Sequence, residues 1–177
     1  MGAVSSWRAQ KEALSACLAV HSSVSFRLLP EASMQRVQES CSTLAEAILT
    51  RAPTAGLAQL VLMQGTVDPD VRSRQLALAQ AIAPLEAMQV KLRIEAGLDH
   101  FDTLSSDARL ATQADMALLL STTWGRSWLS AVYLDRADNR SGIAEVLATV
   151  PEPDQRAFLA LLKRSAVALP SHPAVER

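Results

Sequence analysis

The chain has 177 residues and a formal net charge of −1, and Ala and Leu, with 30 and 26 residues, make up about a third of it. Seven residues are aromatic and six are glycine, which disfavours an architecture of strands and tight turns. The hydrophobic fraction of 49% excludes a disordered chain, and the balanced charge gives no reason to expect a nucleic-acid partner. The composition therefore predicts an all-α protein, a single-domain antiparallel bundle of about seven or eight helices.

Three apolar patterns predict helices in the first third of the chain. The first begins after Ser5-Ser6 and covers residues 7–24, and a second opens at Pro30, in the position that proline favours. The apolar residues of the second helix follow alternating steps of three and four, the pattern of a packed helix seam: Met34, Val37, Cys41, Leu44 and Ile48. A short apolar helix is expected over residues 57–63.

A longer helical pattern covers residues 69–96 and starts at Asp68-Pro69-Asp70, a strong helix start. Pro84 lies in its middle, and we expect a helix kinked there, a bent pair on one axis, with a full break as the open alternative. Beside its heptad row the pair carries a second apolar row: Leu76, Ala79, Ala83, Val90 and Ile94. A helix that is apolar on two sides must be central or covered by a partner.

Four further helices are expected over residues 106–120, 123–132, 143–147 and 152–169, with a polar loop at residues 135–142. Residues 170–177 hold two prolines and no apolar period, which predicts a disordered tail behind a bundle domain of residues 1–169.

Three sequence features concern the location and the covalent modification of the chain. No apolar run approaches the roughly 20 residues of a transmembrane helix, and charged residues interrupt the first fifteen, so we expect a cytoplasmic protein. The start Met1-Gly2 fits the loose pattern for N-myristoylation, which leaves lipidation of Gly2 open. Cys17 and Cys41 lie in apolar helical patterns and are interpreted as buried small side chains, with a disulfide as the minor alternative.

One polar cluster has ligand-like chemistry. Glu95, Asp99 and Asp102 surround His100, and two carboxylates beside an imidazole can hold a divalent metal ion or orient the imidazole as a base. The cluster follows a glycine-ended helix, where acidic residues commonly cap the next helix, and Phe101 is expected to pack inward. We therefore expect a structural role, with no catalytic residue and no cofactor, and keep the four as weak metal candidates.

The segment Trp124-Gly125-Arg126-Ser127-Trp128 places two tryptophans on one side of a helix and Arg126 on another. A core pair is the favoured interpretation, and a partner-binding or ligand-contact patch is the alternative, because Trp and Arg dominate interface hot spots. The W-G-R triplet resembles the central piece of the BH1 segment of the Bcl-2 family. Since the chain lacks that family's Gly-Asp-containing BH3 segment and its later Gly-Gly-Trp, this resemblance sets no expectation.

Basic residues are 14 Arg and three Lys, a preference that we attribute to genome composition. Four of them are expected on the outer face of the kinked helix as a short basic patch: Arg72, Arg74, Lys91 and Arg93.

Apolar helix faces outnumber catalytic groups, so the sequence favours a protein-interaction module (an adaptor, a secretion or assembly accessory, or a small regulator) with a protein partner or a second copy. One alternative is a bundle that binds a small apolar ligand, with five lining candidates: Met88, Met116, Trp124, Trp128 and Phe158. The other is a coat on a lipid or granule surface, since residues 47–64 resemble phasins, which implies an amphipathic surface protein. An enzyme is the least supported class.

Overall fold

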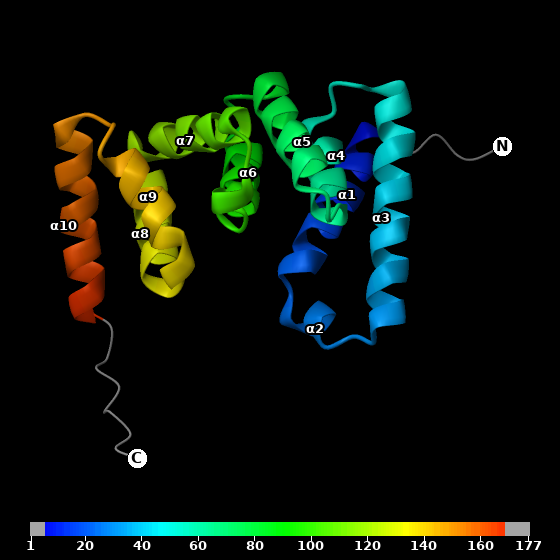
Figure 1. Cartoon of the computed structure of the whole chain (residues 1–177), viewed down its shortest axis with the longest axis horizontal. Helices are drawn as coiled ribbons and strands as arrows, with labels where there is room; N and C mark the ends of the chain where they lie inside the picture. The colour runs from blue at the N-terminus through cyan, green and yellow to red at the C-terminus, as the bar shows by residue number, and fades with distance from the viewer. Residues whose placement is uncertain (1–5, 169–177) are drawn as a thin grey trace, which may run out of the picture. The chain divides into compact units, whose positions relative to one another are not determined.

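A computed structural model describes residues 6–168, and within this range the secondary structure is helical, without strands (Figure 1). Nine of the described helices have eight residues or more, and α2 (Val24–Arg27) is a single turn, so the all-α prediction is confirmed. The chain divides into two compact units, Met1–Thr112 and Gln113–Arg177, where the sequence predicts one bundle. Gly2 and the expected tail at 170–177 lie outside the described residues.

Unit 1 is built around a buried central helix. Its elements are α1 (Trp7–Ser22), α2, α3 (Glu31–Arg51), α4 (Gly56–Gly65), α5 (Pro69–Ile82), α6 (Ala87–Leu98), the 3₁₀ turn η1 (Phe101–Thr103) and the start of α7 (Ser106–Leu120). Helix α4 packs against α1, α3, α5 and α6, and residues 56–61 and Met63 are buried. The phasin-like stretch thus contributes the core of unit 1, and α4 has no exposed apolar face for a surface coat.

The chain breaks at Pro84 and does not merely kink there. Helix α5 ends at Ile82 and α6 begins at Ala87, as expected where proline removes a helical donor and clashes with the preceding turn. The break lets the two helices bury their apolar rows independently. Leu76 and Val90 are almost fully buried, whereas Leu85 in the connection is 76% exposed.

A buried arginine side chain closes the break at Pro84. Arg93 is fully buried, and its guanidinium donates to the Ala83 carbonyl at 2.9 Å and to the Pro84 carbonyl at 3.5 Å. The expectation of an outward basic patch is therefore wrong for Arg93. Arg72 also turns inward to a backbone carbonyl, whereas Arg74 is exposed as expected.

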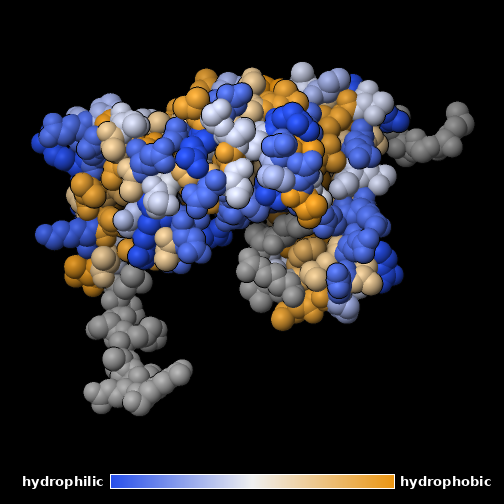
Figure 2. All heavy atoms as spheres, viewed as in Figure 1, coloured by the Kyte–Doolittle hydropathy of each residue, from blue (hydrophilic) through white to orange (hydrophobic). Residues whose placement is uncertain are grey.

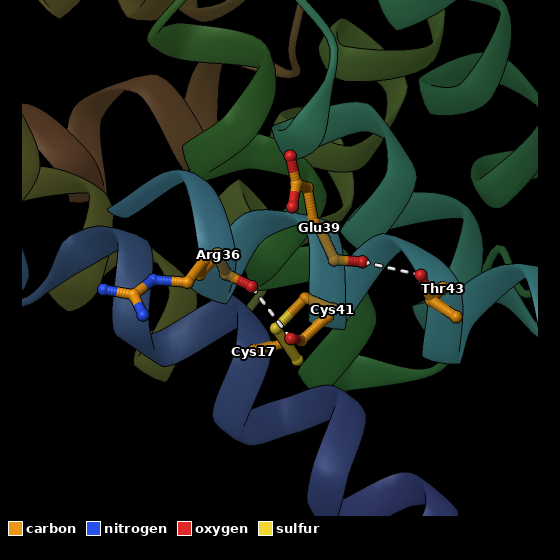
Figure 3. Close-up of a disulfide and its surroundings, with 6 residues drawn as sticks. Cys17, Arg36, Glu39, Cys41 and Thr43 are labelled. Atoms are coloured by element: carbon orange, nitrogen blue, oxygen red, sulfur yellow. Dashed lines mark hydrogen bonds between the residues drawn. A yellow bond between two sulfur atoms is a disulfide. The ribbon is translucent and has the colours of Figure 1, made fainter. Parts of the chain in front are cut away.

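A disulfide joins α1 to α3 (Figure 3), which corrects the interpretation of free cysteines. Cys17 and Cys41 are buried, as the sequence predicts, and their Cα atoms lie 5.8 Å apart. Cys41 belongs to the predicted seam of α3, whose member Ile48 is also buried. On the same helix Ser40 and Thr43 direct their hydroxyls to backbone carbonyls one turn earlier. The covalent link is thus placed on the apolar side of α3.

Unit 2 contains the end of α7, α8 (Thr123–Asp135), the 3₁₀ turn η2 (Ala137–Asn139), α9 (Arg140–Leu147) and α10 (Glu152–Ala168). Helices α8 and α10 pack together, and Tyr133 meets the buried Phe158 edge to face at 6.3 Å between ring centroids. The loop expected at 135–142 is mostly η2 and the start of α9. Arg140, the first residue of α9, stabilises this compact connection, because its guanidinium donates to the carbonyls of Tyr133 and Leu134 at the end of α8.

Arginine side chains repeatedly bind the carbonyl end of the preceding α-helix. This arrangement occurs after α4, α5, α7 and α8, with these four donors: Arg72, Arg93, Arg126 and Arg140. Helix ends leave carbonyls without a partner, and a left-handed glycine is a common device to satisfy them. No residue between positions 6 and 168 has a positive φ, so the described helix ends do without that device. The guanidinium fork offers several donors, which lysine does not offer in the same plane.

Candidate functional site

Exposed apolar side chains are spread over the chain. Figure 2 shows hydrophobic and hydrophilic residues interspersed on the face in view. These large apolar residues are more than half exposed: Trp7, Leu28, Val67, Leu85, Met88, Leu110, Trp124, Leu159 and Val167. Each described helix is too short or too polar to cross a membrane. A contact site therefore has to be identified from the geometry around individual residues.

The two tryptophans of α8 form a stacked pair at the surface of unit 2. The ring centroids of Trp124 and Trp128 lie 6.5 Å apart with 9° between the planes. Trp124 is 55% exposed and Trp128 is half-buried, so the favoured interpretation of a core pair is wrong for Trp124. An exposed aromatic stack offers a large apolar contact area with little conformational freedom left to lose.

Arg126 lies between the tryptophans in sequence but is occupied by contacts within unit 2. Its guanidinium donates to the Leu120 carbonyl at 2.7 Å and to the Asp154 carboxylate at 2.9 Å, and both charged side chains are largely buried. These bonds tie α8 to the end of α7 and to the start of α10. The candidate interaction residues therefore divide: the tryptophans can face a partner, and Arg126 holds the helix that carries them.

The cluster around His100 does not converge. Glu95 pairs with Lys91 at 3.6 Å, Asp102 is exposed, and within the described part of the chain no three His, Cys, Asp or Glu side chains are placed to share a metal ion. Burial lowers the pKa of His100, the nearby positive charge of Arg72 acts in the same direction, and Asp99 opposes them.

The aromatic neighbour of His100 has a structural position. Phe101 is buried as expected, and the Arg109 guanidinium stacks 4.8 Å over its ring. The segment 99–103 is therefore organised around the packing of Phe101.

A cavity of about 290 Å³ lies in unit 1, and none of its lining residues was a candidate from the sequence. It opens where the start of α4 meets α1 and the α5–α6 connection, and its lining residues are Trp7, Lys11, Thr54, Ala55, Gly56, Leu57, Ile82, Ala83, Glu86 and Gln89. Lys11 Nζ and Glu86 Oε1 pair at 2.9 Å beside it. The hydrogen bond from Lys11 lowers the pKa of the Glu86 carboxyl, against the opposing effect of burial.

The expected apolar-ligand pocket is not this cavity. Its five candidate residues are absent from the lining: Met88 is largely exposed in unit 1, and Met116 and Phe158 are buried in unit 2. Two glutamines, Gln75 and Gln89, stand in the otherwise apolar heptad row of residues 71–92, and the sequence does not show that only Gln89 lines a cavity. An amide in such a row needs polar partners, and the Pro84 break supplies one of them in Glu86.

The pair of tryptophans and the cavity thus stand as the two candidate sites of this chain. No protein-family model, curated protein or solved structure matches it.

Proposed function

We propose that the protein is an interaction module that binds a protein partner through the Trp124–Trp128 stack on α8. The observation that carries the proposal is the 55% exposure of Trp124 within a parallel stack. Tryptophan is enriched among residues that dominate binding energy, and a stacked pair loses little conformational freedom on binding. The expected partner surface is apolar, because Asp154 already neutralises Arg126.

The support beneath the stack favours this role. Leu129 and Ser130 of α8 are buried, and Gly125 lies so close to the Leu119 backbone that a Cβ there would overlap it. Together with the Arg126 bonds, these contacts fix the helix in unit 2. A preorganised surface binds more tightly than one that must order on binding.

The test uses the full chain and two matched variants. Trp124→Ala removes the exposed ring, and Leu28→Ala removes a 79% exposed leucine from unit 1 as the control. Self-association is measured by light scattering over a range of concentrations, and a partner captured from the native host is titrated against each variant. We expect the affinity of the complex to fall about 30-fold or more in Trp124→Ala and to stay unchanged in Leu28→Ala. Equal affinity of Trp124→Ala and the parent chain contradicts the proposal.

The location of this activity has two opposing indications. The sequence predicts the cytoplasm, whereas disulfides such as Cys17–Cys41 persist mainly in oxidising compartments. We infer that the folded chain works where its thiols stay oxidised. Alkylation of free thiols in the native host at the moment of lysis distinguishes the two compartments. Alkylated cysteines support the cytoplasm, and cysteines that a disulfide protects from alkylation support an oxidising compartment.

A further inference from the structure

Helix α1 has few buried side chains for its length. Among residues 7–20, the buried positions are Leu14, Cys17 and Leu18. Helix α6, which is four residues shorter, buries seven. The partly buried hydrophobic residues that pack on the core of unit 1 come from other described segments: Val37, Leu44, Leu49, Ala52, Leu62, Leu92 and Leu104. Since local stability follows the number of buried apolar contacts, packing alone holds α1 less firmly than it holds α6.

A covalent link and an ion pair also attach α1 to unit 1. The Cys17–Cys41 disulfide joins the second half of α1 to α3 (Figure 3). In the first half, Lys11 Nζ pairs with Glu86 Oε1 at 2.9 Å. Both charged side chains are 42% exposed, and an ion pair with such access to water contributes little. The disulfide is therefore the stronger of these two attachments.

Helix α1 covers parts of unit 1 that would otherwise meet water. It packs against α4, whose residues 56–61 and Met63 are buried. Trp7 and Lys11 of α1 also form part of the lining of the cavity at the start of α4. Separation of α1 from α4 removes these two side chains from the lining and exposes apolar surface of α4, which is unfavourable. A change in the attachment of α1 therefore changes access to the cavity and to α4.

We propose that α1 is a redox-released strap, a helix that leaves α4 when a dithiol reduces the Cys17–Cys41 disulfide, while α3 to α6 stay folded. The chemistry is thiol–disulfide exchange. A thiolate of the dithiol attacks one cysteine sulfur, so the protein disulfide breaks and a mixed disulfide forms. The second thiolate of the dithiol then displaces the protein sulfur from the mixed disulfide. The protein gains two electrons and two protons as two thiols, and the dithiol loses them and becomes a disulfide.

Reduction favours the open state through the conformational freedom of α1. Thiols are small apolar groups that suit the buried positions of Cys17 and Cys41, so the closed state keeps its packing. In the open state the disulfide still tethers α1 to α3, whereas two thiols leave the connecting segment free, which raises its entropy. Helix α4 keeps its contacts with α3, α5 and α6 when α1 leaves. This strap lies in unit 1 and does not depend on the Trp124–Trp128 surface of unit 2.

The experiment compares the oxidised full-length protein with the same protein in excess dithiothreitol, without denaturant, by hydrogen exchange and mass spectrometry. In the reduced protein we expect amide exchange in α1 to become at least about tenfold faster than in the oxidised protein and to run ahead of exchange in α5 and α6. Binding of 8-anilinonaphthalene-1-sulfonate, which reports exposed apolar surface, should raise its fluorescence on reduction.

Matched variants separate the loss of the disulfide from other effects of the reductant and of alanine. Cys17→Ala/Cys41→Ala has no disulfide, so α1 should exchange fast with and without dithiothreitol. Ser15→Ala/Ser40→Ala changes two small side chains on the same two helices and keeps the disulfide. Its α1 should be protected when oxidised and should exchange fast only after reduction, as in the parent chain.

Three results overturn the proposal. The first is equal protection of α1 in the oxidised and the reduced protein, which shows that the disulfide does not control the helix. The second is a simultaneous loss of protection in α1, α5 and α6, which makes reduction a general unfolding of unit 1. The third is slow exchange of α1 in Cys17→Ala/Cys41→Ala, which shows that packing alone holds the helix.

Discussion

Removal of the Cys17–Cys41 disulfide is expected to destabilise unit 1 by several kcal/mol. The link spans a sequence separation of 24 residues, and loop-closure entropy for such a loop amounts to about 3.4 kcal/mol at 25 °C. The double variant Cys17→Ala/Cys41→Ala keeps small apolar side chains at these two buried positions. Loss of the constraint on the unfolded chain therefore accounts for most of the expected change.

The assay is urea unfolding of the oxidised protein, the reduced protein and the double alanine variant. We expect the reduced protein and the variant to unfold together, each about 3 kcal/mol less stable than the oxidised protein. Hydrogen exchange, measured by mass spectrometry, shows which unit loses protection, and both cysteines belong to unit 1. Protection should fall in unit 1 and persist in unit 2.

Two results would refute the reasoning. One is an intact mass of the purified, unreduced protein that retains both thiol hydrogens. The other is a difference in unfolding free energy below about 0.5 kcal/mol between oxidised and reduced protein, which is far under the loop-closure value.

Three further changes test individual side chains. Arg93→Met leaves the Ala83 and Pro84 carbonyls without their donor and should lower the unfolding free energy by about 2 kcal/mol in urea titrations; unchanged stability contradicts a capping role. The pKa of Glu86 is lowered in the folded chain, so its stabilising effect is fully present above the ordinary carboxyl pKa of 4.5 and is lost as the pH falls through the folded-state pKa. Glu86→Gln should therefore flatten the pH dependence of thermal stability in that acidic window. Burial lowers the pKa of His100 below 6.5, so the unfolded chain takes up the proton first and stability falls as the pH drops below 6.5. His100→Gln should abolish that slope, and a persisting slope assigns it elsewhere.

Helix positions were predictable because each is encoded locally. The seam from Met34 to Ile48 and the start at Asp68-Pro69 depend on spacing and on capping within one turn. Asp68 accepts from the backbone N–H groups of Asp70 and Val71, as the sequence pattern implies. The spacing of apolar residues shows that residues 69–96 have two apolar sides. It does not show which other helices pack against those sides.

Contacts between distant segments were not predictable in the same way. The pairing of Cys17 with Cys41 requires that α1 and α3 lie side by side, which no local pattern contains. The burial of Arg93 depends on the break at Pro84, whose carbonyl it binds, so interpreting the proline as a kink also misplaced the arginine. Exposure of Trp124 likewise follows from which side of α8 meets α10.

The candidate site shows the same division. The sequence singled out the tryptophan pair, whose spacing of four places both rings on one side of a helix. It did not reveal the cavity, because Lys11, Gly56 and Gln89 come from three separate segments.

The arginine contacts at the helix ends have a consequence for the order of folding. Their donors and acceptors are separated by six to ten residues, and a loop of about ten residues closes within roughly 10–100 ns. Each helix junction can therefore form before the slower encounter of α1 with α3, whose disulfide requires chemical oxidation. Because these junction contacts are local in sequence, they lower the contact order of the chain, which favours rapid folding. Four of the 14 arginines therefore serve at helix junctions, a role for part of the arginine content that genome composition alone does not describe.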